Sequence, residues 1–298
     1  MPVDSDGQPW VGRVKGSWVM KFTISMLISV AAVVASAPAF AADYDPPLVE
    51  DVIDEYVPVE VGSGWYLRGD IGYVAATSSS GTATYRTFDP ITATYGDNTF
   101  ATQRLRSNLT WGGGFGYRFT DWLRADLTVD GLKTKFSGTT TSAAPCLNTA
   151  AFAGTGCRSE DGATMSTLSF MGNVYADLGT YAGFTPYAGA GAGYSYVTWT
   201  NLTNSLYCTG ACPVGFIGDT VHGGTKSWRF SYNLMAGVAY DVSNNMKIDV
   251  GYKYRRVAGG PMFNFDPGSF AAGANGVQGR DKGLSTHEFR VGLRYELW

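Results

Sequence analysis

The ten residues that end the chain, Phe289 to Trp298 (FRVGLRYELW), alternate between apolar and polar side chains. Every second position is apolar, whereas Arg290, Arg294 and Glu296 lie between the apolar ones. Alternate side chains of a β-strand point to opposite faces, so this strand has one apolar and one charged face. A transmembrane barrel produces this pattern because one face meets lipid and the other meets the lumen. The segment therefore predicts a membrane-spanning strand in an all-β fold.

The composition of the chain agrees with many strands joined by small-residue loops. Of the 298 residues, 45% are hydrophobic and 14% aromatic, only 16% are charged, and 39 are Gly. The formal net charge of -3 is small and mixed in sign. It therefore does not suggest nucleic acid, or an anionic membrane surface, as a partner of the chain as a whole.

The start of the chain has the pattern of an export signal. Met20 and Lys21 precede an apolar run at 22–35, and the small-x-small sequence at 39–41 predicts cleavage before Ala42. We therefore expect residues 1–41 to be an upstream extension plus a signal peptide, with Met20 as the true start. No later segment reaches the roughly 18 consecutive apolar residues of a transmembrane helix. For an exported chain without such helices, strands are the remaining way to cross a membrane.

Residues 42–64 contain seven acidic residues and three prolines but no Lys or Arg. Such a segment cannot bury a core, and we expect an extended, largely disordered periplasmic arm. It serves either as a solvated spacer or as a contact for a basic partner, and the sequence does not separate the two.

Residues 65–298 contain eight candidate strands with the alternation of the C-terminal segment. They lie at 65–75, about 104–119, 122–136, 164–178, 186–199, 227–242, 246–257 and 289–298. Long connections at 76–103, 137–163, 199–226 and 258–284 alternate with short ones near 120, 180–185 and 243–245. Barrels of bacterial outer membranes have short periplasmic turns and long outer loops. The sequence thus predicts an eight-stranded antiparallel up-and-down transmembrane β-barrel with four long outer loops.

Charged side chains occupy the inward positions of these strands. Eight strands enclose a lumen just wide enough to be filled by side chains, so we expect opposite charges to pair and to plug it. A narrow, gated ion path is the alternative. Alternate glycines at 112, 114 and 116 leave room for long side chains nearby. The expected network comprises Arg68, Asp70, Arg118, Arg124, Asp126, Asp249, Lys253, Arg290, Arg294 and Glu296, with Asp130, Asp177, Asp241, Lys247, Arg255 and Glu288 as further inward charges.

The four cysteines form two near pairs, Cys146 with Cys157 and Cys208 with Cys212, in the second and third outer loops. In an exported chain this even, local spacing predicts two loop disulfides. A metal site is disfavoured because the chain has only two histidines to serve as further ligands.

A catalytic site finds little support in the sequence. The only nucleophile and bases close together are Ser285, His287 and Glu288. Adjacent residues of a strand point to opposite faces, so Glu288 cannot orient His287 as a triad requires. We therefore expect no enzymatic activity and no cofactor. If the loops bound haem, Tyr207 and His222 would be the candidate axial ligands.

Three segments carry a family resemblance: GWYLRGDIGY at 64–73, PYAGAGAGY at 186–194 and VGLRYEL at 291–297. With the signal peptide and the acidic arm, the chain resembles alphaproteobacterial eight-stranded outer-membrane proteins. That family includes the major 25 and 31 kilodalton outer-membrane proteins of the rhizobial order. The last segment is similar to the family's C-terminal targeting strand, although Leu297 holds the place of the usual final aromatic. That strand comprises Phe289, Val291, Gly292, Leu293, Tyr295, Leu297 and Trp298.

The resemblance implies a location in the bacterial outer membrane, insertion by the barrel-assembly machinery through the C-terminal strand, and outer-membrane lipids as partners. It supplies no catalytic residues. We expect a monomer or weak oligomer that is not an enzyme, contributes to envelope integrity and presents its loops to extracellular ligands. The alternatives are a narrow porin-like channel for ions or small solutes, and a surface adhesin or haem-binding protein. A lipid-modifying enzyme is a further, more distant alternative.

Overall fold

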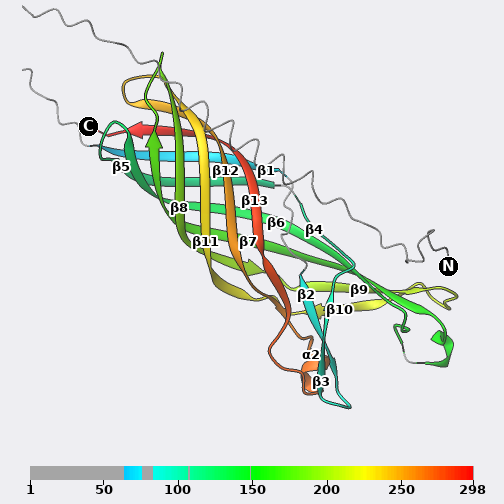
Figure 1. The fold of residues 1–298 in the computed structure, drawn as a ribbon. Helices are drawn as coiled ribbons and strands as arrows, with labels where there is room; N and C mark the ends of the chain where they lie inside the picture. Colours follow the sequence, from blue (N-terminus) through cyan, green and yellow to red (C-terminus); the bar gives the residue numbers. More distant parts are fainter. Residues whose placement is uncertain (1–63, 76–82, 107, 148, 298) are drawn as a thin grey trace, which may run out of the picture. The chain divides into compact units, whose positions relative to one another are not determined.

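The computed structural model describes residues 64–75, 83–106, 108–147 and 149–297, which lie within the unit Glu60–Trp298 (Figure 1). The expected export signal at 1–41, with its start at Met20, lies outside the described residues. The same holds for Trp298 and, apart from Gly64, for the acidic arm.

Eight strands form a closed antiparallel ring. The last strand pairs with the first, with Tyr66 opposite Glu296 and Ala75 opposite His287, so the ring has no free edge within the barrel wall. The predicted fold class is confirmed. In ring order the strands are β1 (Trp65–Ala75), β5 (Asn108–Arg118), β6 (Leu123–Ser142), β7 (Gly156–Asp177), β8 (Phe184–Trp199), β11 (Lys226–Asp241), β12 (Met246–Asn264) and β13 (Val277–Glu296).

The alternation in the sequence sets the two faces of the wall. On β1, Leu67 and Ile71 are exposed on the outside, whereas Tyr66 and Asp70 are buried inside. Glycines give the inside the space that these side chains need. A Cβ atom at Gly116 would clash with the ring of Tyr66, so the phenol occupies the volume that a side chain there would fill.

Several strands continue well beyond the membrane-spanning lengths expected from the sequence. The pairing of β6 with β7 is unbroken from Leu123 opposite Ala176 to Ser142 opposite Cys157. Five further strands, a helix and a 3-10 turn occupy most of the segments expected as loops, and we call this region the crown. It contains β2 (Thr84–Asp89), β3 (Thr94–Thr99), β4 (Thr102–Leu105), η1 (Ala150–Phe152), β9 (Leu202–Thr209), β10 (Phe216–His222) and α2 (Pro267–Ala271). Of these, β2, β4 and β9 pair with the outer parts of β13, β6 and β7.

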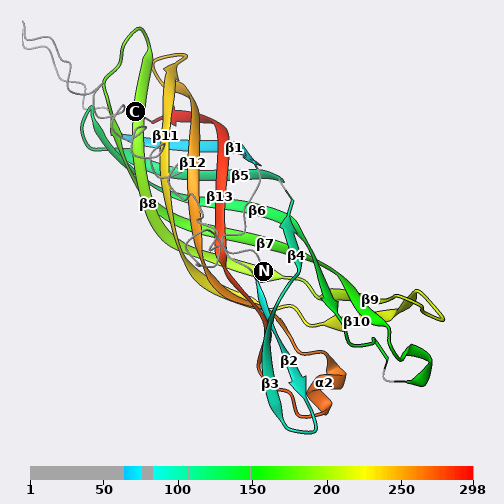
Figure 2. The ribbon, with the colours of Figure 1, turned by 45° about the vertical axis from the view of Figure 1, so that its right-hand side comes forward.

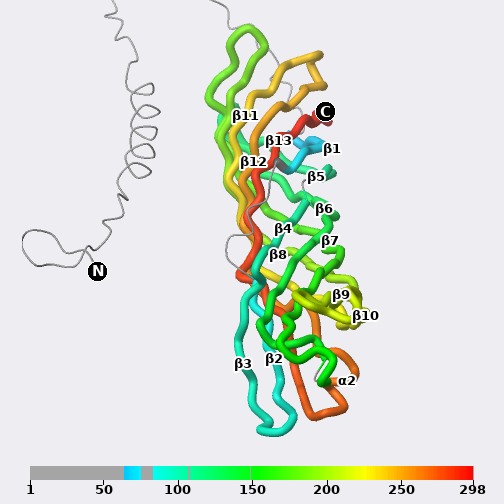
Figure 3. Tube along the Cα trace, turned by 90° about the vertical axis from the view of Figure 1, so that its right-hand side faces the viewer, coloured from blue at the N-terminus to red at the C-terminus, as the bar shows by residue number. Residues whose placement is uncertain are grey.

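Figures 1 and 2 show the hairpins β2–β3 and β9–β10, together with α2, projecting from one end of the ring. Figure 3 shows β2, β3 and α2 at the end opposite to the C-terminus. No helix among the described residues is long and apolar enough to cross a membrane. The long outer loops are therefore folded extensions of the barrel for most of their length.

The polarity of the wall inverts along β6. Leu127 is exposed on the outside, but farther along the strand Lys133 and Lys135 take the outward positions and Phe136 turns inward. Two further apolar residues are buried inside. Trp199 on β8 is 4% exposed and follows the same inversion. Leu105 is 8% exposed, although simple alternation with Leu109 would place it on the lipid face, because the pairing with β6 shifts by one residue between Leu105 opposite Phe136 and Thr110 opposite Leu132. The outer face of the wall is thus apolar only where it contacts lipid. Beyond the membrane the outer face contacts water and carries polar residues.

We predict that Leu234→Arg, at the middle of β11, destabilises the protein in lipid vesicles by about 2–4 kcal/mol, because an arginine would face hydrocarbon. Leu234 is 54% exposed. Val214 in the crown is 53% exposed, and Val214→Arg serves as the matched control, with an expected effect within about 0.5 kcal/mol. Urea titration of both variants in bilayers measures the difference. Equal losses would contradict a lipid-facing position for Leu234.

Candidate functional site

The inner half of the lumen is filled by ion pairs between strands. Asp126 accepts a bond from Arg68 Nη1 at 2.9 Å, and Asp177 accepts one from Arg124 Nε at 3.0 Å. Two further pairs join Arg290 to Asp70 and Arg118 to Glu296, and Arg294 contacts Asp249 at 3.1 Å. Each carboxylate therefore has a cation from another strand or from an adjacent inward position, as a desolvated charge requires.

The network continues toward the crown around Asp130. This carboxylate lies 2.9 Å from Lys253 Nζ and 2.9 Å from Arg255 Nη2. Glu288 is buried beside it and accepts a hydrogen bond from Thr110 Oγ1 at 2.9 Å. Paired charges thus occupy the lumen in successive layers, which leaves little free charge to attract an ion.

An apolar layer closes the lumen between these charges and the crown. Its residues are nearly inaccessible, for example Val74 and Val197 at 1% exposure each. Aromatic rings cross the lumen here, and Phe136 packs edge-on against Trp199 at 5.8 Å. The cavity beside these residues measures about 30 Å³, enough for about two water molecules. Its wall also includes Arg229 and Asp281, which form an ion pair at 2.7 Å. We call this layer the seal; it comprises Val74, Ala83, Phe100, Leu105, Leu132, Phe136, Met165, Val197, Trp199, Leu202, Val257, Met262, Phe263 and Leu284.

Above the seal lies the crown pocket, with a volume of about 250 Å³. Its apolar wall comes from Tyr85, Phe100 and Phe263. The polar wall includes Asp161, whose two oxygens accept bonds from Ser159 Oγ at 2.8 Å and Asn204 Nδ2 at 2.6 Å. The pocket is lined by Tyr85, Phe100, Thr140, Asp161, Leu202, Asn204, Thr220, His222, Phe263 and Gln278.

The crown pocket has three titratable groups, Tyr85, Asp161 and His222, and burial raises the pKa of the Tyr85 phenol. Burial lowers the pKa of His222, although Asp266 and Asp161 act in the opposite direction. Burial also raises the pKa of the Asp161 carboxyl against the hydrogen bonds from Ser159 and Asn204. Nδ1 of His222 is buried without a hydrogen-bond partner among the described residues. The pocket therefore offers a neutral imidazole and a partly satisfied carboxyl to whatever enters it.

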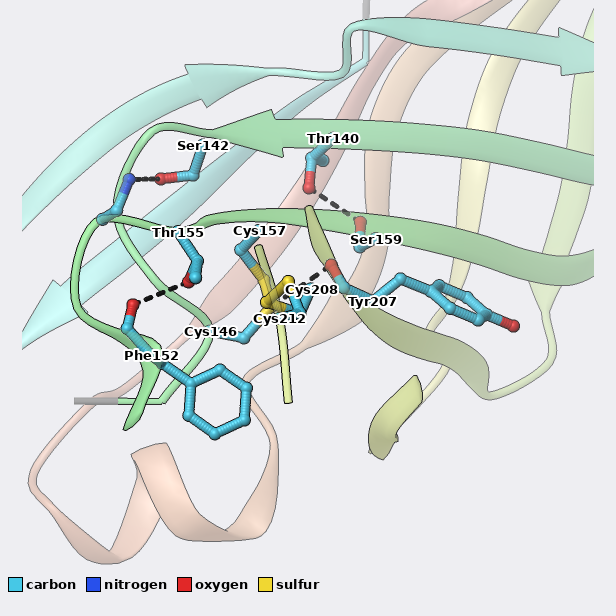
Figure 4. Close-up of a disulfide and its surroundings, with 11 residues drawn as sticks. Thr140, Ser142, Cys146, Phe152, Thr155, Cys157, Ser159, Tyr207, Cys208 and Cys212 are labelled. Atoms are coloured by element: carbon cyan, nitrogen blue, oxygen red, sulfur yellow. Dashed lines mark hydrogen bonds between the residues drawn. A yellow bond between two sulfur atoms is a disulfide. The ribbon is translucent and has the colours of Figure 1, made fainter. Parts of the chain in front are cut away.

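Two disulfides tie the crown together (Figure 4). The structure joins Cys146 to Cys157 and Cys208 to Cys212. Cys157 lies directly opposite Cys208 in the pairing of β7 with β9, so the two bridges are neighbours. They fix the connection between β6 and β7 and the tip of the β9–β10 hairpin, which limits the number of conformations open to these segments.

The structure does not assemble the three candidate catalytic residues. Ser285 and His287 make contacts on the outer wall, where Ser285 Oγ lies 3.3 Å from the hydroxyl of Tyr254 and His287 Nδ1 lies 2.5 Å from that of Tyr252. Glu288 points into the lumen. The carboxylate and the imidazole are therefore on opposite sides of the barrel wall.

The two candidate haem ligands are also apart. Tyr207 pairs with Phe216 at one end of the β9–β10 hairpin, and His222 pairs with Leu202 at the other. Five residues along a strand separate their backbone positions by about 16 Å. The ring of Tyr207 lies 5.5 Å from that of Phe216, whereas the ring of His222 lies 6.1 Å from that of Phe263. The structure thus gives no shared haem site for this pair.

Most residues of the seal and the crown pocket were missed by the sequence reasoning. Some of them, such as Phe100 and Leu284, fall in the connections expected as loops. Others, such as Leu132 and Phe136, lie within the predicted strand at 122–136, where they take inward positions that alternate with Lys133 and Lys135. That continued period of two, with polarity reversed, was the available signal.

The family model described as outer membrane protein beta-barrel domain matches residues 27–296. An uncharacterized protein of Brucella suis is 33% identical over 294 residues, which covers 93% of this chain and all of the relative. A protein of Rickettsia felis named putative adhesin is 28% identical, over 66% of this chain and 73% of its own.

Among solved structures, the outer membrane protein OprG from Pseudomonas aeruginosa aligns with a TM-score of 0.38 and 14% identity, over 79% of this chain and 97% of its own. Neisserial surface protein A aligns with a TM-score of 0.36 and 15% identity, over 80% of this chain and all of its own.

We predict that the crown pocket loosens in acid. Because its pKa is lower in the folded state, His222 contributes stability that is present above about pH 6.5, its ordinary pKa, and is lost as the pH falls. Hydrogen exchange should therefore show lower protection factors for residues 216–222 at pH 5 than at pH 7.5. His222→Gln should remove most of this difference, because Asp161, with its raised pKa, acts in the opposite sense. An equal loss of protection in His222→Gln would contradict the assignment.

Proposed function

Because the chain belongs to the outer membrane protein beta-barrel domain family, we propose that it is a non-conducting, non-enzymatic anchor whose folded crown binds ligands outside the cell. The protein is an outer-membrane protein of a Gram-negative envelope. The observation that carries the proposal is the contrast between a closed lumen and an elaborate crown on the same strands. A pore protein would need the opposite arrangement, with a wet lumen.

The seal argues against the channel alternative. An ion crossing it would exchange its hydration shell for aliphatic and aromatic carbon, and the cost of burying an unpaired charge is large. The paired charges below the seal add a second obstacle, because a passing ion would have to displace contacts such as the one between Lys253 and Asp130. Both features favour a structural and surface role.

The crown supplies the features of a binding module. Its pocket is preformed, combines aromatic with polar walls, and is held by strands that continue directly from the barrel. A preformed site loses less conformational freedom when it binds, which favours affinity. The relative in Rickettsia felis is named a putative adhesin, which supports a surface-binding role for this chain as well.

Three finer expectations remain part of the proposal. These are membership of the narrower group with the 25 and 31 kilodalton proteins, insertion through the C-terminal strand by the barrel-assembly machinery, and a monomeric or weakly oligomeric state. The outward alternation of Phe289, Val291, Leu293 and Tyr295 in β13 supports the second of these.

We expect no steady current from the folded protein in a planar bilayer, because the seal leaves no continuous water path. An open porin recorded under the same conditions provides the positive control. Migration of the unboiled protein in gels verifies that the silent protein is folded. A steady, ion-selective current would overturn the non-conducting anchor and favour the channel alternative.

We further predict that replacing residues 203–221 by a short Gly-Ser turn leaves the barrel folded but reduces attachment of displaying cells to epithelial monolayers several-fold. Leu202 and His222 already face each other at the base of this hairpin, so the turn can close without strain. A Gly-Ser replacement of the opposite turn, residues 243–245, is the control. Unchanged attachment after removal of the hairpin would contradict binding through this part of the crown.

A further inference from the structure

The outer wall of the barrel carries a polar row of side chains at the level where its polarity inverts. The pairing places Lys133 of β6 opposite Ser166 of β7, Ser166 opposite Thr198 of β8, and Thr198 opposite Lys226 of β11. All four residues occupy outward positions, and both lysines are exposed. Three strand spacings separate the lysines, which corresponds to about 14 Å.

An apolar row lies directly below the polar row, toward the membrane centre. Trp111 is opposite Gly131, Gly131 opposite Leu168, Leu168 opposite Tyr196, and Tyr196 opposite Trp228. The two tryptophans that end the row are 58% and 60% exposed. Indole rings of this kind prefer the boundary between hydrocarbon and polar headgroups. The two rows therefore mark the outer membrane interface.

A groove of about 370 Å³ crosses the wall where the two rows meet. Its lower part is apolar, with Leu109, Trp111, Leu168 and Tyr196, and its upper part carries Lys133 and Thr198. Gly131 contributes no side chain to the floor, and the ring of Trp111 lies against it. The groove thus combines a surface for an acyl chain with hydrogen-bond donors and a cation above it.

More cations surround the polar row, and they lack competing anions. Arg106 and Lys135 are exposed and joined by a backbone hydrogen bond of 3.1 Å from Arg106 N–H to Lys135 O. None of Lys133, Lys135 and Lys226 forms an ion pair with a carboxylate in the described part of the chain. The nearest outward acid along these strands is Glu160, opposite Thr139, which lies about 20 Å from Lys133 along β6 and is already paired with Arg158.

We propose that this surface is a binding site for a phosphorylated, acylated glycolipid of the outer leaflet. The acyl chains lie on the apolar row and in the groove, and the anionic groups at the two ends of the headgroup contact Lys133 and Lys226. Basic side chains near a membrane surface attract anionic lipid headgroups electrostatically. The small net charge of the whole chain does not reveal this local cluster of basic residues. The site does not depend on whether the crown binds a ligand.

The test is native mass spectrometry of the full protein in detergent with bisphosphorylated lipid A as the probe. Each lysine should contribute about fivefold to affinity, so Lys133→Gln with Lys226→Gln should weaken binding by about 25-fold. The matched control is Arg280→Gln with Lys282→Gln, two exposed basic residues on β13, which should leave binding unchanged. Migration of unboiled protein and the circular dichroism spectrum verify the fold of each variant.

Two further arms identify the source of the interaction. Dephosphorylated lipid A should bind wild type and the Lys133/Lys226 double variant equally, because the acyl contacts remain. Millimolar inorganic phosphate should not displace lipid A, since it lacks the acyl chains. Equal affinity of wild type and double variant for bisphosphorylated lipid A, an equal loss in the β13 control, or displacement by phosphate alone would each overturn the proposal.

Discussion

The closure of the backbone hydrogen bonds into a ring is the constraint on which the rest of this structure depends. Lipid offers no partner to a free N–H or C=O group, so β13 must return to β1. Eight strands are enough for closure, but they leave an interior only as wide as side chains. The interior must therefore be packed, and each inward residue has to find its partner there. Ion pairs such as that of Arg124 with Asp177 follow from this narrowness.

The side chains that fill the lumen change along the barrel axis from ion pairs to apolar residues, and the two kinds contribute differently to stability. Buried ion pairs roughly compensate the desolvation of their charges and add little net stability. The seal, by contrast, removes aliphatic and aromatic side chains from water, which is the main favourable contribution to folding. A lumen with ion pairs below and apolar residues above therefore combines a specific register between strands with a stable, closely packed interior. The same apolar packing that stabilises the fold is the basis of the proposal that the barrel does not conduct.

The alternation of apolar and polar residues in the sequence predicted the strands and the two faces of each strand, but little else. It placed β1 at 65–75, where the structure has it, and it assigned Arg68, Asp126 and Lys253 to the inside, where they lie. Which cation pairs with which carboxylate depends on the register between strands that are far apart in the sequence. The individual ion pairs could therefore not be predicted from the sequence. The ends of β6 and β12 were missed because the period continues past the membrane while the solvent outside changes from lipid to water. Lys133 and Phe136 lie within the predicted strand at 122–136 and already show the reversed polarity, but the strand continues to Ser142.

The same inversion of polarity separates the two surfaces on which function is proposed. Below the level of Lys133 the outside must be apolar, so specific chemistry is confined to the interface itself, where lysine and tryptophan meet on adjacent rows. Above that level both faces of the strands are free to vary, and the crown uses the inward face for its pocket. Because β6 and β7 pass through both regions without a break in pairing, the crown keeps the rigidity of the barrel. A ligand in the crown pocket would contact Thr140 and Asp161, which lie on these two strands.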